Sequence, residues 1–284
     1  MNFTTKDIGL IDPGSLLVFG GVYSNLEALL ALKAKADNLQ IPPDRIICTG
    51  DIVAYCADPE ACVQLIRDWG IHCIAGNVEI QLRERQDDCG CNFEEETRCD
   101  IFSRHWYPYA RRMVSEEALE WMETLPHHLT FQFGNKKFRV VHGSYFGVSE
   151  YVFASTSTDH KTRNFEASKS DVILAGHCGL PFGEKIGNYI WWNAGVIGMP
   201  ANDGTTRIWF STIYWAGENS PMEFRHHPLH FDESRTHQKM IANELPTEYA
   251  ETLMTGLWDN CEILPDAETK IQGIPLVLDD KLIC

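Results

Sequence analysis

Five apolar segments of this chain each end in a polar turn that contains glycine, and this arrangement restricts the fold more than any other feature. The turns are FGGVYSN (19–25), TGDIVAYC (49–56), AGNVE (75–79), VVHGS (140–144) and AGHCGLPF (175–182). Amphipathic stretches with helical spacing follow Asn25 and the pair Asp58 and Pro59. The order strand, helix, strand, helix, strand predicts parallel pairing, with the carboxyl ends of the strands opening into one crevice.

The order and spacing of these turns resemble the signature of the calcineurin-like metallophosphoesterases, D-x-H, G-D, G-N-[HC]-[DE], H and G-H-x-H. The stretch 49–79 looks especially like the small bacterial and archaeal phosphodiesterase branch. The resemblance implies an α/β fold, a four-layer α/β/β/α sandwich of two mixed sheets flanked by helices. We expect this domain to span 1–215, with 80–125 as a lid-like insertion. Residues 216–284 then form a C-terminal extension packed on the same domain.

The resemblance assigns two metal ions to the crevice, and the ligand positions of the second ion are all filled. They are the bridging aspartate Asp51 together with Asn77, His142 and His177. This mixture of oxygen and nitrogen donors suits Mn, Zn or Fe. Such an ion can polarise a phosphoryl oxygen or lower the pKa of a bound water towards about 7. We therefore expect one divalent ion per chain.

The positions that belong to the first metal alone are all substituted. They hold Gly21, Tyr23 and Gly179 where the family has aspartate, histidine and histidine. Tyr23 would either fill the vacated space or bind a metal as a phenolate. Val78 stands where the family has a substrate-protonating histidine, whereas Glu79 keeps the adjacent acidic position. Hydrolysis by the usual two-metal route is therefore disfavoured, because one ion cannot easily clamp both the entering and the leaving oxygen.

Three functions fit these residues. The first is a metal-dependent phosphoesterase with one ion, or with a rebuilt second site, in which Glu79 or Tyr23 handles protons. The second is a catalytically impaired pseudoenzyme that binds a phosphorylated ligand or a protein in the inherited crevice. The third is a metalloenzyme of another class, with Tyr23 and thiolates such as Cys56 or Cys178 as additional ligands.

Cysteine usage and the lack of long apolar runs indicate a cytoplasmic protein. The ten cysteines lie within strand and helix patterns, as reduced thiols do. Cys89, Cys91 and Cys99 match structural zinc sites imperfectly, and they either bind a metal or pack a partly buried lid. No apolar run reaches the ~18 residues of a membrane-spanning helix. The apolar stretch 16–19 is too short for a signal peptide.

The formal net charge of −16 restricts the partners. Nucleic acid polymers and anionic membranes bind basic surfaces, so we expect neither. A small phosphoester, or a protein partner, fits better. The sequence does not determine the oligomeric state.

Outside the crevice, the sequence predicts a helix from Ser115 to about Leu125 that is stopped by Pro126. The stretch 190–210 predicts two strands joined by a turn, and the resemblance implies that they form a hairpin of the second sheet. Further on we expect a strand near Leu229 and a helical stretch from 234 to 257 interrupted by proline.

Overall fold

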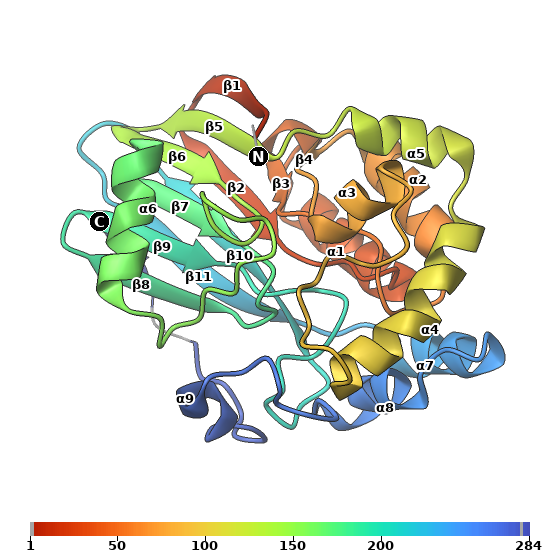
Figure 1. Ribbon diagram of the computed structural model, residues 1–284. Coiled ribbons are helices and arrows are strands. Elements are labelled where there is room, and N and C mark those ends of the chain that lie inside the picture. The colour runs from red at the N-terminus through yellow and green to blue at the C-terminus, as the bar shows by residue number, and fades with distance from the viewer. Residues whose placement is uncertain (1–2, 279–280) are drawn as a thin grey trace.

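The computed structural model describes residues 3–278 and 281–284, and its centre consists of two six-stranded sheets packed face to face (Figure 1). The first sheet has the order β1 (Thr5–Ile11), β5 (His128–Phe133), β6 (Lys136–Val140), β7 (Val172–Ala175), β9 (Tyr189–Asn193) and β8 (Phe182–Ile186). The second has the order β12 (Leu282–Ile283), β11 (Met222–Leu229), β10 (Ile208–Trp215), β2 (Gly14–Phe19), β3 (Ile46–Cys48) and β4 (His72–Cys73). Both sheets mix parallel and antiparallel pairs.

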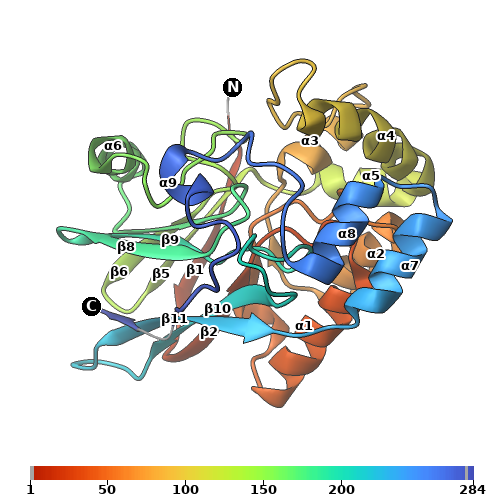
Figure 2. The ribbon, with the colours of Figure 1, turned by 90° about the horizontal axis from the view of Figure 1, so that it is seen from below.

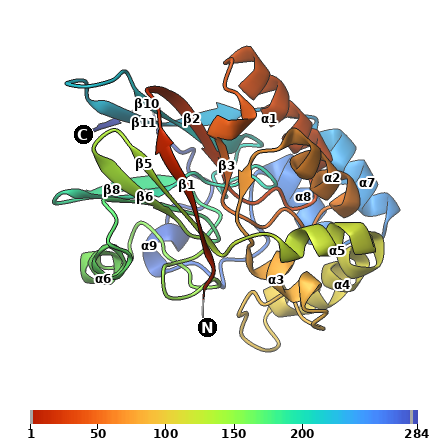
Figure 3. The same cartoon turned by 90° about the horizontal axis from the view of Figure 1, so that it is seen from above.

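Helices cover the outer faces of both sheets (Figures 2 and 3). The larger group lies beside the second sheet and consists of α1 (Leu26–Asn38), α2 (Pro59–Trp69), α3 (Asn77–Arg83), α4 (Arg98–Met113), α5 (Glu116–Glu123), α7 (Glu233–Ala242) and α8 (Thr247–Thr255). On the other side lie α6 (Thr158–Ser168) and the short α9 (Asp266–Thr269). A 3-10 helix (Pro43–Arg45) precedes β3. The predicted α/β/β/α sandwich is confirmed.

Strand β2 is buried on both faces of its sheet. Its side chains alternate: Leu16 and Val18 point into the core between the sheets, whereas Leu17 and Phe19 point into the core beneath the helices. All four are fully buried. A strand covered on both faces is apolar throughout instead of alternating with polar residues, and the LLVF run has this composition.

The hairpin predicted over 190–210 is wrong. Strand β9 lies in the first sheet and β10 lies in the second, so the segment 194–207 crosses between the sheets. Local turn residues mark where a strand ends, but they do not determine which sheet the next strand joins. The crossover is held to the end of β2 by a bridge between Gly20 and Val196.

The segment 80–125 is more helical than expected. The predicted helix after Ser115 is confirmed as α5, whose cap is the Ser115 hydroxyl accepting a hydrogen bond from the Ala118 N–H. Helix α4 was not predicted, because it is strongly polar and contains Pro108. Its buried face includes Trp106 and Tyr109, whose hydroxyl donates to the Ala57 carbonyl.

The C-terminal segment adds to the central structure. The expected strand is β11, which pairs with β10 along its full length, and the expected interrupted helix is α7 followed by α8. Helix α7 packs against α1, far from it in sequence, and α8 packs against α7. Within 3–278 and 281–284, no helix is both long and apolar enough to cross a lipid bilayer.

Candidate metal centre

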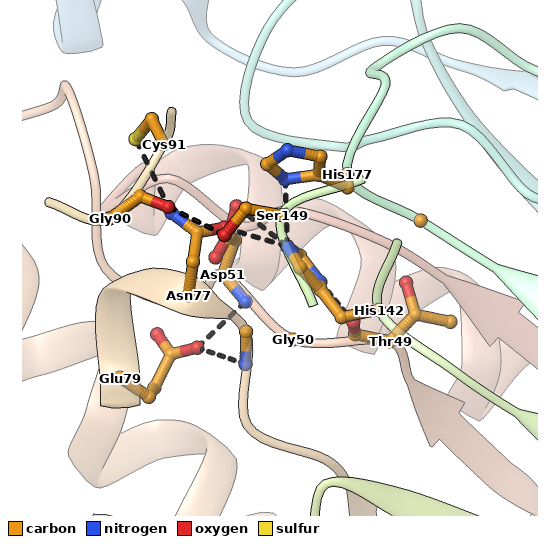
Figure 4. Close-up of polar contacts among 12 residues, drawn as sticks. Thr49, Gly50, Asp51, Asn77, Glu79, Gly90, Cys91, His142, Ser149 and His177 are labelled. Carbon is orange, nitrogen blue, oxygen red and sulfur yellow. Dashed lines mark hydrogen bonds and ion pairs between the residues drawn. The ribbon is translucent and has the colours of Figure 1, made fainter. Parts of the chain in front are cut away.

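The four predicted metal ligands come together where strands of both sheets end. Asp51 follows β3, and Asn77 is the first residue of α3, after β4. His142 follows β6 and His177 follows β7, in the other sheet. All four side chains are buried, with at most 7% of any residue exposed. Figure 4 shows them directed toward one another.

The donor atoms converge on one point. The Nε2 atom of His142 lies 3.1 Å from Asn77 Oδ1 and 3.1 Å from His177 Nδ1. It lies 3.2 Å from Asp51 Oδ2. Ligands about 2.1 Å from an ion and at right angles to each other are about 3.0 Å apart. Among the described residues, one group of acidic, histidine and cysteine side chains has ligand atoms that all lie within 4.8 Å of one another: Asp51, His142 and His177. The four residues therefore fit a single ion.

Hydrogen bonds hold each ligand in the required orientation. His142 Nδ1 donates to the Thr49 carbonyl at 2.7 Å, which leaves the lone pair of Nε2 for the centre. The Asn77 amide nitrogen donates to the Cys89 carbonyl at 2.9 Å and to Cys91 Sγ at 3.3 Å, which turns its oxygen toward His142. The insertion therefore orients one of the ligands.

Two buried polar atoms at the centre have no hydrogen-bond partner. They are Asp51 Oδ1 and His177 Nε2. Buried polar atoms are nearly always hydrogen-bonded. The atoms of the same two residues that lie beside His142 Nε2 are Asp51 Oδ2 and His177 Nδ1. Burial and the neighbouring His142 lower the pKa of His177 to about 3, which keeps it in the neutral form that binds metals.

Glu79 does not reach the centre. Its carboxylate is fully buried and accepts hydrogen bonds from the N–H groups of Asp51 at 2.8 Å, Gly76 at 2.9 Å and Val53 at 3.0 Å. Burial and the charge of Asp51 raise the pKa of Glu79 to about 7, against the effect of these bonds. These three bonds tie Glu79 to the loops that carry Asp51, Val53 and Gly76.

The backbone around Asp51 depends on this support. Asp51 has a φ of 56°, in the left-handed region that a non-glycine residue rarely occupies. A Cβ atom at position 76 would lie only 2.1 Å from Asp51 Oδ1, so glycine is required there. Glu79 joins both residues through their N–H groups and so stabilises the strained turn.

Aromatic rings cover the positions where the resembled family carries its first-metal ligands. A Cβ atom on Gly21 would lie 2.5 Å from Cε1 and Cζ of the Tyr23 ring. A Cβ atom on Gly179 would lie 3.2 Å from the ring of Trp258. Burial, and then the charge of Asp51, raise the pKa of Tyr23 well above its usual value, which disfavours a phenolate ligand.

The cysteines proposed as alternative ligands have other contacts. Cys178 Sγ accepts a hydrogen bond from Asn193 Nδ2 at 3.1 Å, and burial raises its pKa to about 12. Cys99 Sγ lies 3.5 Å from Asn260 Oδ1. Within the described part of the chain, Cys89, Cys91 and Cys99 do not form a cluster with metal-ligand spacing. Cys91 and Cys99 do line the cavity beside the centre.

That cavity, of about 80 Å³, opens beside Asp51 and His177. Six aromatic side chains line it: Tyr23, Tyr55, Phe93, Tyr151, Tyr249 and Trp258. Phe93 belongs to the insertion, and Tyr249 and Trp258 belong to the C-terminal segment. Sequence reasoning identified Tyr23 but missed the other five, since their positions depend on how distant segments pack and no local motif marks them.

Comparisons with known proteins bear on the family and the fold. The sequence profile of the "Calcineurin-like phosphoesterase superfamily domain" matches residues 23–213. An uncharacterised protein of Methanocaldococcus jannaschii is 26% identical over 261 residues, or 85% of this chain and 98% of that protein.

Two solved structures share the fold. A metallophosphoesterase from Sphaerobacter thermophilus superposes with a TM-score of 0.67 and 22% identity, covering 87% of this chain and 100% of that one. A hypothetical protein from Pyrococcus horikoshii superposes with a TM-score of 0.72 and 17% identity, covering 86% of this chain and 99% of that one.

Proposed function

Because the chain belongs to the calcineurin-like phosphoesterase superfamily, we propose that it is a phosphoesterase that works with one divalent metal ion. The ligands of this ion are Asp51, Asn77, His142 and His177. The observation that carries the proposal is the convergence of three donor atoms within 3.2 Å of His142 Nε2. Two oxygens and two imidazole nitrogens suit Mn, Zn or Fe.

A single ion is proposed because the positions that hold the first metal's own ligands in the resembled family carry no such donor here, and rings restrict two of them. The Tyr23 ring lies where a side chain at position 21 would be, and Trp258 restricts position 179. Position 78 offers no replacement group, since Val78 is 1% exposed and belongs to the core beneath the helices.

The residues of the chain divide the work of hydrolysis. When bound, the ion supplies Lewis acidity, which polarises a phosphoryl oxygen and favours ionisation of water. Hydrolysis joins the water oxygen to phosphorus and breaks the bond from phosphorus to the leaving oxygen. Tyr23 lines the cavity next to Asp51 and is the residue that we assign to hydrogen-bond the phosphoester. Glu79 acts as a positioning residue through its bonds to Asp51 and Gly76.

The proposed substrate is a small phosphoester. With a net charge of −16, the chain would repel nucleic acid polymers and anionic membranes. We also propose a cytoplasmic location, supported by ten cysteines that are all free thiols, eight of them buried.

Elemental analysis tests the proposal directly. Protein purified without chelator or metal-affinity resin should contain close to one equivalent of Mn, Zn or Fe. It should also hydrolyse an aryl phosphodiester. Asp51→Asn should lose both properties while its circular dichroism spectrum stays unchanged, whereas Asp68→Asn, on the exposed end of α2, should retain both. Absence of metal after Mn, Zn and Fe have each been supplied would refute the proposal.

A binding protein without turnover is the second candidate. It is favoured by one observation: Tyr23 and Trp258 cover two positions that carry ligands in the resembled family. Tight, metal-dependent binding of a phosphonate with no hydrolysis of any phosphoester would support this candidate against the enzyme.

A further inference from the structure

The cavity beside the metal centre has an aromatic wall that the proposed chemistry does not itself require. Tyr23 contacts Tyr55 edge to face, with ring centroids 4.8 Å apart, and Tyr55 contacts Tyr249 at 4.7 Å. On the other side, Tyr151 packs on the His177 ring at 4.3 Å. Val196, Met199 and Ile263 complete the apolar part of the lining. Rings therefore extend from the metal ligands outward along the cavity.

The lining contains no cationic side chain. Its charged residues are two aspartates, Asp51 and Asp259, and no Lys or Arg is among the residues that line it. Asp259 is paired with Arg98, whose guanidinium donates to Asp259 Oδ1 at 2.7 Å. A ligand with phosphate groups remote from the ion would thus have no positive group to bind them. The cavity accepts an uncharged, apolar body.

The lining is also poor in proton donors. Apart from the proposed ligand His177, its ionisable O–H and S–H groups are phenols and thiols. Phenols have a pKa near 10, so at neutral pH they are weak general acids. A leaving group that departs without taking up a proton suits such a site better than an alkoxide does.

From these observations, and resting on the function proposed above, we propose that the cavity binds an aromatic ester group and that the substrates are aryl phosphoesters. The water oxygen bonds to phosphorus and one proton of that water passes to solvent. The bond from phosphorus to the aryl oxygen breaks, and the aryloxide leaves with the electron pair. The ring stacks against the aromatic wall, where offset and edge-to-face contacts are favourable.

Binding of two phosphonates that differ only in the organic group tests the inference without turnover. At a pH well above their second pKa values, phenylphosphonate and methylphosphonate are both dianions, and their P–C bonds resist hydrolysis. We expect calorimetry on the metal-loaded protein to show at least tenfold tighter binding of phenylphosphonate. Trp258→Leu should reduce the ratio to less than about threefold. Tyr214→Leu, at an exposed aromatic position on β10 outside the cavity, should leave it unchanged.

Turnover provides a second readout in case Trp258→Leu folds poorly. The wild-type protein should accelerate the hydrolysis of phenyl phosphoesters, relative to the uncatalysed rate, at least a hundredfold more than that of alkyl phosphoesters of equal charge. Inorganic pyrophosphate should compete weakly. Equal affinity for the two phosphonates, or tighter binding of pyrophosphate, would overturn the aryl inference while leaving the metal-dependent function intact. Failure of the protein to bind metal would remove the proposed function itself, so the two failures are distinct.

Discussion

The phenol ring of Tyr23 covers the α-carbon of Gly21, so closely that a Cβ atom on Gly21 would lie 2.5 Å from two ring atoms. The two residues are separated by one position in the chain, and Tyr23 has a φ of 54°, which directs its ring back over the preceding turn. A side chain at position 21 and the phenol ring of Tyr23 therefore compete for the same space, so the two positions are coupled.

This pairing predicts a non-additive effect on stability. Gly21→Asp alone should lower the free energy of unfolding by about 2 kcal/mol, since it overpacks a buried site. In the Tyr23→Ala background the same change should cost less than half as much, because two of the three atoms nearest to the new Cβ are then gone, the third being Val196 Cγ1 at 2.9 Å. Urea denaturation of the two single variants and the double variant measures the coupling. Additive losses would show that the ring and the new side chain do not compete.

Glu79→Gln should weaken metal binding without touching a ligand. A glutamine carries only one acceptor oxygen, so at least one of the three N–H groups from Asp51, Val53 and Gly76 loses its partner. We expect a loss of ~1–3 kcal/mol in unfolding free energy. Metal affinity should fall by about 10–100-fold, as for other residues that orient ligands. Competition with a chromogenic chelator measures the affinity. Glu120→Gln, at an exposed position, is the control.

His226 makes stability depend on pH. Its ring stacks on Trp192 at 4.1 Å and Nε2 donates to the Asn193 carbonyl at 2.8 Å. Burial lowers its pKa to about 4, below the ~6.5 of an unfolded chain. Between these values the unfolded state binds the extra proton, so the free energy of unfolding falls as pH falls, by up to ~3 kcal/mol in total.

The variant His226→Gln should remove this contribution. Wild type and variant should differ in the slope of unfolding free energy against pH between pH 6.5 and 4, with the flatter line for His226→Gln. Above pH 7 the slopes should coincide. The exposed His230→Gln serves as the control. Parallel lines for wild type and His226→Gln over the whole range would mean that His226 titrates normally in the folded protein.

Most of the candidate metal centre could be predicted from sequence because each proposed ligand follows its own strand. Asp51, Asn77, His142 and His177 stand directly after apolar runs, and the carboxyl ends of parallel strands meet at one edge. The orientation of Glu79 could not be predicted in this way. Its direction is determined by three N–H groups of neighbouring loops, whose positions exist only in the folded chain.

The aromatic wall was beyond prediction for a similar reason. Trp258 reaches Gly179 from a segment almost eighty positions away, and its position depends on hydrogen bonds to Asn202 and to the Pro200 carbonyl. These partners belong to the crossover between β9 and β10, which the sequence misassigned to a hairpin. An error in assigning one strand to a sheet thus concealed part of the cavity.

Restoring the first metal should require removal of both covering rings. Gly21→Asp, Tyr23→His and Gly179→His together supply the three missing ligands of the resembled signature. Tyr23→His also replaces the phenol ring with a smaller imidazole. The Cβ atom at position 179 would still lie 3.2 Å from Trp258, and Gly179 has a φ of 77°, so the new imidazole is restricted. We expect the triple variant to hold close to one ion per chain.

Adding Trp258→Ala frees the space that the imidazole needs, and the quadruple variant should approach two ions per chain by elemental analysis. Asp51→Asn in that background should lower the content again, because the resemblance makes Asp51 a ligand of both ions. Two ions in the wild-type chain would contradict the filling of this site by Tyr23 and Trp258.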